Sequence, residues 1–324
     1  MSSQVCCIKS IFAFLVVASG VTPSSSLGQA VQLPGDNGKV GVPYSLGPKG
    51  QEFVFTLEKA EFAHRAFFQD NAMWAGENQR VLILWFAVQN PGKADRNFHG
   101  SIFKLTVVSP DDKNSVGNGG LYYADTLQGV NVQIKPAQKI RVFAPILIHP
   151  RGVVNKLIVQ PASGPVLRYD LRTTTKWVPD AFAGDNGVDI LEVGKAKVGV
   201  PFGIGWFDFT IEKVEESTAE SGGIKPEEGK KLIIATLTVK NVSKFKPAFA
   251  ENFLPVKMLD ENGEEIHSVG MRKMSGDESP AHQNYDPGQQ MRCRLVFDGP
   301  STVKPVSLKL TDAASGRSVV LTLK

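Results

Sequence analysis

The sequence predicts an all-β protein built from two tandem immunoglobulin-like β-sandwich domains. Three observations predict this fold: sequence blocks that recur in the same order, strands in which apolar and polar residues alternate, and frequent turn signals. The 324 residues suffice for about two domains of ordinary size. With 31 glycines and 20 prolines, turns are frequent, and short strands are favoured over long helices.

The first residues predict a signal peptide, so we expect the protein to be exported. Lys9 precedes an apolar run over residues 11–21, and Gly28-Gln29-Ala30 offers a small-x-small cleavage site. This run is shorter than the about 20 residues that span a bilayer, so no transmembrane segment is expected in the mature chain. We assign residues 1–30 to the signal peptide and expect a periplasmic or secreted location. The alternative is an uncleaved anchor or a buried N-terminal strand.

Four sequence blocks occur twice along the chain. The pairs are KVGVP at 39–43 and 197–201, FVFTLEK at 53–59 and FDFTIEK at 207–213, VLILWFAVQN at 81–90 and LIIATLTVKN at 232–241, and IKPAQ at 134–138 and YDPGQ at 285–289. Blocks that keep their order indicate a duplication. We assign residues 31–172 and 197–324 to two sandwich domains. Residues 173–196 form the linker, where Trp177 and Phe182 predict packing between the domains.

Each block has the pattern of a strand that ends in a turn. Side chains alternate with a period of two over residues 232–240, as is typical of a strand. Asn90 and Asn241 mark the turn after this strand in the two copies. Residues 260–263 (DENG) predict a hairpin turn. Alternating apolar residues over 291–297 predict another strand.

The second copy resembles a known family of domains in four short motifs. These are Val239-Lys240-Asn241 at a strand end, Phe253-Leu254-Pro255, the hairpin at residues 260–263, and Pro287-Gly288-Gln289 before an apolar strand. They are similar to DUF4352-type domains, which are immunoglobulin-like sandwiches of bacterial secreted proteins and lipoproteins. The first copy resembles the family more weakly, because it lacks the Asp-x-Asn-Gly hairpin. The resemblance implies the fold and export, and it brings no catalytic residues.

Charge and cysteine content narrow the classes of function. The net charge of +4 is spread along the chain without a concentrated basic stripe, so nucleic-acid binding is not expected. After residues 1–30 only Cys293 remains, so no intrachain disulfide can form and each domain depends on its core. Cys293 aligns with Val142 of the first copy, which predicts a core position. No cofactor is expected.

No catalytic motif occurs in the sequence, so we expect a protein that is not an enzyme. None of the five histidines has a zinc-ligand spacing, and no nucleophile elbow is present. One alternative is an extracytoplasmic metal-handling protein, because imidazole and thioether donors that suit Cu(I) cluster in the second copy. This set is His267, Met271, Met274 and His282. A second alternative is a secreted hydrolase with a site built from scattered residues.

The best lead to function is a set of aromatic residues that only the first copy has. The strand at 81–88 is apolar on both faces, and the loop before it is rich in aromatic residues. Large apolar patches mark interaction sites, so we expect a binding surface at Phe67, Phe68, Trp74 and Trp85. Alternatively, the loop covers its own sheet or packs on the second domain. The expected function is a non-enzymatic binding or scaffolding protein whose partner is a protein or another cell-envelope ligand.

Overall fold

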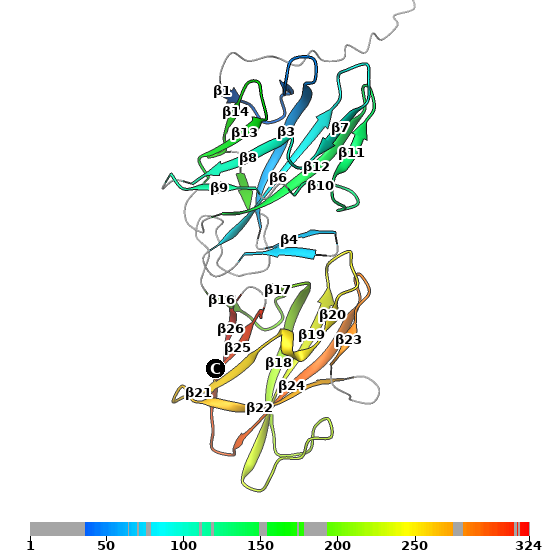
Figure 1. Cartoon of the computed structure of the whole chain (residues 1–324). Helices are drawn as coiled ribbons and strands as arrows, with labels where there is room; N and C mark the ends of the chain where they lie inside the picture. The colour runs from blue at the N-terminus through cyan, green and yellow to red at the C-terminus, as the bar shows by residue number, and fades with distance from the viewer. Residues whose placement is uncertain are drawn as a thin grey trace, which may run out of the picture.

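The computed structural model describes residues 36–63, 65–69, 71–75, 79–109, 112–117, 120–148, 154–173, 175–177, 193–274, 281–313, 316 and 318–323. Within these ranges the regular structure is β-strand apart from one 3-10 turn, η1 (Glu251–Phe253). The predicted all-β fold class is confirmed. Figure 1 shows two β-sandwiches, one from the first half (residues 36–177) and one from the second half (residues 193–323).

Two predicted segments fall mainly outside this description. The signal peptide at residues 1–30 lies outside the described residues, and so does most of the linker, at 178–192. No helix in the described ranges is long and apolar enough to cross a membrane.

The first half consists of two facing sheets and a small extra pair. One sheet has the order β1 (Asp36–Gly38), β14 (Leu167–Asp170), β13 (Lys156–Pro161), β8 (Phe103–Val108), β9 (Asn114–Val116). The other has the order β10 (Tyr122–Tyr123), β12 (Lys139–Ile148), β6 (Arg80–Gln89), β3 (Phe53–Ala63), β15 (Thr175–Trp177), and β2 (Tyr44–Leu46) also pairs with β3. The extra pair is β7 (Arg96–His99) with β11 (Asn131–Ile134). Alternating apolar side chains such as Phe55, Phe86 and Tyr169 fill the space between the sheets.

The second half has one continuous order of strands that folds over a single core. It runs β16 (Val193–Ala196), β26 (Ser318–Thr322), β25 (Pro305–Thr311), β21 (Val256–Asp260), β22 (Glu265–Lys273), β24 (Gln290–Pro300), β19 (Lys230–Asn241), β18 (Phe207–Ser217), β17 (Phe202–Ile204), with β20 (Ala248–Phe249) paired to β23 (Gln283–Asn284). Strand β22 pairs with β21 near Ile266 and with β24 from His267 onward, so it passes from one layer to the other. Its register shifts between Ser268 and Gly270, and such bulges bend a strand.

A hairpin of β4 (Arg65–Phe68) and β5 (Asn71–Trp74) extends from the first half beyond β3. Figure 1 shows β4 in the space between the two sandwiches. The hairpin contains most of the aromatic residues that the sequence singles out, so its contacts decide what they do.

Asn90 and Asn241 hold equivalent loops in the two halves. Both side chains are fully buried. In each, Nδ2 donates to two backbone carbonyl oxygens. Asn90 donates to those of Ala94 and Ile134, both at 2.8 Å. Asn241 donates to those of Phe245 and Tyr285, at 2.7 and 3.0 Å. A buried amide needs such partners, which explains why both copies keep asparagine after the strand.

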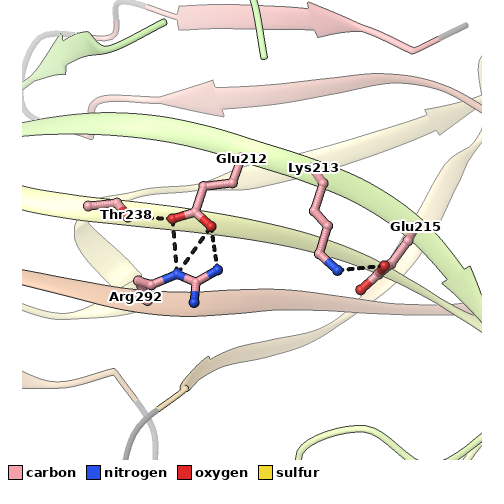
Figure 2. A network of polar contacts seen from close by, with 5 residues as sticks. All are labelled: Glu212, Lys213, Glu215, Thr238 and Arg292. Atoms are coloured by element: carbon pink, nitrogen blue, oxygen red, sulfur yellow. Dashed lines mark hydrogen bonds and ion pairs between the residues drawn. The ribbon is translucent and has the colours of Figure 1, made fainter. Parts of the chain in front are cut away.

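The glutamate of the FVFTLEK and FDFTIEK blocks makes the same ion pair in both halves. Glu58 pairs with Arg141, and Glu212 pairs with Arg292. Figure 2 shows that Glu212 also accepts a hydrogen bond from Thr238, at 2.7 Å. Both glutamates lie where the strand register shifts, so the two halves share this bulge as well as the ion pair.

Cys293 is a core residue, as the alignment with Val142 predicts. Its side chain is fully buried among the apolar residues of the second half. Burial disfavours the thiolate and raises the pKa of Cys293 to about 12. The thiol therefore packs as a small apolar group.

Candidate functional site

The β4–β5 hairpin presents two different faces, because side chains alternate along a strand. Ala66 and Phe68 of β4 are buried, whereas Arg65 and Phe67 between them are half-buried. The register places Trp74 opposite Arg65, so this tryptophan shares the face of Arg65 and Phe67. The two faces contact different parts of the protein.

One face of the hairpin covers the outer side of its own sheet. Phe68 stacks on Tyr122 with ring centroids 4.3 Å apart, and it packs in a cluster with Val81 and Ile83 of β6. Trp85, on the same side of β6, lies against Phe143 at 5.0 Å. The apolar outer face of this sheet is therefore covered by the chain itself, as one alternative from the sequence predicts.

The other face of the hairpin contacts the second half. Phe67 stacks on Trp206 at 5.3 Å with the ring planes 13° apart. Trp74 meets the same indole edge-on at 6.0 Å. The loop between β17 and β18, which carries Trp206, is therefore in contact with two of the aromatic residues that distinguish the first copy.

Polar contacts reinforce this junction between the halves. The Arg65 guanidinium donates to the carbonyl oxygens of Gly205 and Phe207 at 2.8 and 3.1 Å, and it pairs with Asp208 Oδ1 at 2.6 Å. Its side chain is only 11% exposed, so these acceptors compensate for the loss of water around the charge. Separately, Lys244 Nζ donates to the carbonyl oxygen of Asp125 at 3.0 Å.

The four residues predicted as a binding surface do not share one surface. Phe68 and Trp85 lie on their own sheet, and Phe67 and Trp74 lie against the second half. The structure thus combines two of the alternatives, cover of the sheet and contact between the halves. Phe67 and Trp74 join the two sandwiches, whereas Phe68 and Trp85 cover the sheet of the first half.

A small apolar pocket remains at the junction, beside Trp74 and Trp206. Its volume is about 180 Å³, and Phe253 on its lining is 55% exposed. Pockets that bind small molecules generally have about 300–1,000 Å³. The junction pocket has room for a side chain and not for a ligand of ordinary size.

The four residues of the metal hypothesis lie in different environments. Met271 is fully buried in the core of the second half, whereas His267, on the same strand, and His282 are exposed. Met274 is half-buried just after β22. Among the described residues no group of three His, Cys, Asp or Glu side chains could hold a metal ion. No observation in the structure favours the metal hypothesis.

A larger open groove lies in the second half, along β16, β18, β25 and β26. Its volume is about 1270 Å³. Its apolar lining includes Val198 and Val306, which are 53% and 36% exposed. The charged residues of the lining are Lys195, Lys197, Lys304, Glu215, Glu216 and Glu261. Sequence reasoning missed this groove.

No signal in the sequence reveals the groove, as the repeated KVGVP block illustrates. Val198 and Val200 of the second copy are both exposed. Their counterparts Val40 and Val42 are half-buried and pack on the core of the first half. Identical residues therefore have different surroundings in the two halves, although the sequence of the block alone does not say which copy is open.

A protein-family model matches the second half of the chain. Residues 196–319 match the family model described as "Domain of unknown function (DUF4352)". The resemblance predicted from the four short motifs is thereby confirmed at the level of the domain family. No curated protein matches the chain.

Three of the solved structures that the chain is similar to are two bacterial proteins and one bovine protein. An uncharacterized β-sandwich protein from Clostridium difficile 630 is 18% identical, covers 41% of this chain and 95% of its own, and has a TM-score of 0.32. The yjhA protein from Bacillus subtilis is 15% identical over 40% of this chain and 98% of its own, with a TM-score of 0.27. Bovine butyrophilin is 9% identical over 83% of this chain and 99% of its own, with a TM-score of 0.22.

Proposed function

We propose that this chain is a non-enzymatic exported protein that binds or scaffolds another macromolecule of the cell envelope through the groove of its second half. The groove itself carries the proposal, because it gathers exposed apolar side chains, Val198 and Val306, in one depression of about 1270 Å³. Apolar side chains exposed in a depression can pack against a partner. The signal peptide predicted from residues 1–30 supports export.

The chemistry of the groove supports binding without catalysis. Among the described residues that line it there is no histidine, serine or cysteine, and its candidate general bases are glutamates. Two of its glutamates are held in ion pairs with lysines at 2.7 Å, Glu215 with Lys213 and Glu216 with Lys231.

The junction between the halves supports a scaffolding role. The stacked rings of Phe67 and Trp206 and the ion pair of Arg65 with Asp208 connect the two sandwiches. A partner in the groove would be carried in a defined position relative to the first half, as scaffolding requires.

Site-specific cross-linking in the producing organism tests this function. A photo-reactive amino acid would replace Val198 or Val306 in the groove and, as a control, Val116, which is exposed on β9 of the first half. We expect a defined adduct, in the extracytoplasmic fraction, from the groove positions and not from Val116. Equal adducts from all three positions, or none from the groove, would contradict the proposal.

A further inference from the structure

In the first half, strand β15 closes an edge of the sheet. It pairs with β3 in parallel, with Thr175 opposite Ala60, Lys176 opposite Glu61 and Trp177 opposite Phe62. The other edge of β3 is taken by β6. The backbone of β3 at residues 60–62 therefore has a neighbour on both sides.

The equivalent stretch of the second half can be identified from backbone geometry. The register shifts between Leu57 and Lys59 in β3 and between Ile211 and Lys213 in β18. Just before each shift, a backbone carbonyl accepts a hydrogen bond from a glycine of the KVGVP block. The Gly41 N–H donates to the Leu57 oxygen at 2.7 Å, and the Gly199 N–H donates to the Ile211 oxygen at 2.8 Å. Residues 60–62 of β3 therefore correspond to residues 214–216 of β18.

In the described part of the second half, no strand pairs with residues 214–216 on the side that corresponds to β15. The strand β17 pairs only as far as Phe209, and β19 takes the opposite side, with Val214 opposite Ala235. Val214, Glu215 and Glu216 line the groove. The open edge of the strand and the groove are thus one feature.

We infer that the groove takes an extended polypeptide segment of a partner protein, which adds to β18 at residues 214–216 in parallel, as β15 adds to β3. The inference rests on the proposed binding function and names its partner class. A free strand edge presents unpaired backbone groups that another extended backbone can bind. The chain itself adds a strand in this way at the corresponding edge of the first half.

The lining of the edge indicates which segment fits. Glu215 takes the place of Glu61, and each glutamate is paired with a lysine of its own strand, Lys213 or Lys59. The lining has three lysines and three glutamates, so charge does not select the segment. An extended segment with an apolar residue toward Val198 and Val306 complements the groove.

The test uses the full chain and a synthetic peptide with the sequence of residues 171–178, LRTTTKWV. Hydrogen exchange of the backbone amides is followed by mass spectrometry, with the peptide raised into the millimolar range. We expect slower exchange at residues 214–216. In a control peptide, proline replaces both Thr175 and Lys176, and Trp177 is kept. One of two neighbouring residues must turn its backbone N–H toward β18, and proline has no N–H, so the control loses this hydrogen bond. We therefore expect the control peptide not to slow the exchange at residues 214–216.

Variants locate the binding in the groove. Val306→Arg places a long charged side chain on the lining, and we expect it to weaken peptide binding about tenfold or more. Val116→Arg on β9 is the matched control, since Val116 is similarly exposed and lies in the other half, and we expect unchanged binding.

Each outcome decides between the two proposals. Protection at residues 214–216 that depends on the N–H groups of the peptide supports strand addition. Protection confined to residues 60–62, or none at either place, overturns it. If the peptide gives no protection but Val198 or Val306 gives specific cross-links in cells, the binding function stands and only strand addition is rejected. If both the protection and the cross-links are absent, both proposals are rejected.

Discussion

The ring of Phe67, in the hairpin of the first half, stacks on the indole of Trp206 in the second half with centroids 5.3 Å apart and planes 13° apart. The same indole meets Trp74 and Phe245 edge-on, at 6.0 and 5.8 Å. One tryptophan thus joins two aromatic residues of the hairpin to a loop of its own sandwich. We expect much of the coupling between the halves to depend on it.

Trp206→Ala should weaken the junction and uncouple the unfolding of the halves. Removing the half-buried indole deletes three ring contacts, and we expect a loss of about 2–3 kcal/mol in the free energy of unfolding. Calorimetry should show one transition splitting into two. Val116→Ala, which shortens an exposed side chain on β9 away from the junction, is the control and should leave a single transition. An unchanged transition in Trp206→Ala would mean that the rings do not couple the halves.

Arg65→Lys should destabilise the junction almost as much as Arg65→Ala. The guanidinium bonds to two carbonyl oxygens and to Asp208 at once, and a lysine ammonium lacks the planar fork that reaches all three. We expect a loss of about 1–3 kcal/mol for either change, measured by chemical denaturation. The exposed pair of Lys257 and Glu265 is the reference, and Lys257→Ala should cost less than about 1 kcal/mol.

Much of the fold can be predicted from the sequence, because the residues that both copies share are the ones that stabilise the fold. Asn90 and Asn241 recur because each bonds two carbonyl oxygens of its loop. Cys293 aligns with Val142 because both side chains are buried in equivalent strands of the two cores. Local patterns were enough to predict these elements.

The site was harder to predict because it depends on contacts between distant segments. The alternation of Arg65, Ala66, Phe67 and Phe68 indicates two faces, but it does not tell which segment covers each face. The groove arises where a strand equivalent to β15 is missing beside residues 214–216 among the described residues. An unfilled edge leaves no positive pattern in the sequence, because it is defined only by the positions of the strands in three dimensions.

Glu212→Gln should reduce the pH dependence of stability in acid. The hydrogen bond from Arg292, with a second from Thr238, lowers the pKa of the Glu212 carboxyl below its ordinary value of 4.5. A carboxyl with a lowered folded pKa contributes stability above its unfolded pKa, and this contribution disappears as the pH falls through the folded pKa. The wild-type protein should therefore exceed the variant in stability at neutral pH, and the gap should narrow below about pH 4.5. Denaturation curves over this range measure it, and a constant gap would contradict the assignment.

The proposed export predicts that the mature protein begins just after Ala30. Gly28-Gln29-Ala30 has small residues at the two positions that a signal peptidase reads. N-terminal sequencing of protein from the extracytoplasmic fraction should give Val31 as the first residue. Ala30→Leu should block cleavage and leave the longer chain attached to the membrane, whereas Val31→Ala, one residue further on, should be cleaved normally. A cytoplasmic chain that keeps residues 1–30 would contradict export.

Cys293 should react with alkylating reagents only when the second half unfolds. Its thiol is fully buried, and burial raises its pKa to about 12, so the folded protein holds almost no reactive thiolate at mildly alkaline pH. Labelling should therefore proceed at the rate of unfolding and become rapid in denaturant. Rapid labelling of the folded protein would show that the position is not part of the core.

Substitutions at Cys293 should separate its packing role from its chemistry. Cys293→Val should cost less than about 1.5 kcal/mol, because valine is of similar size and fills the equivalent position, Val142, in the first half. Cys293→Ser should cost about 1–3 kcal/mol, because the core around Met291 and Leu295 is apolar and a buried hydroxyl loses its bonds to water. Chemical denaturation measures both changes. Equal stability of the two variants would contradict the core assignment, since only an exposed position tolerates valine and serine alike.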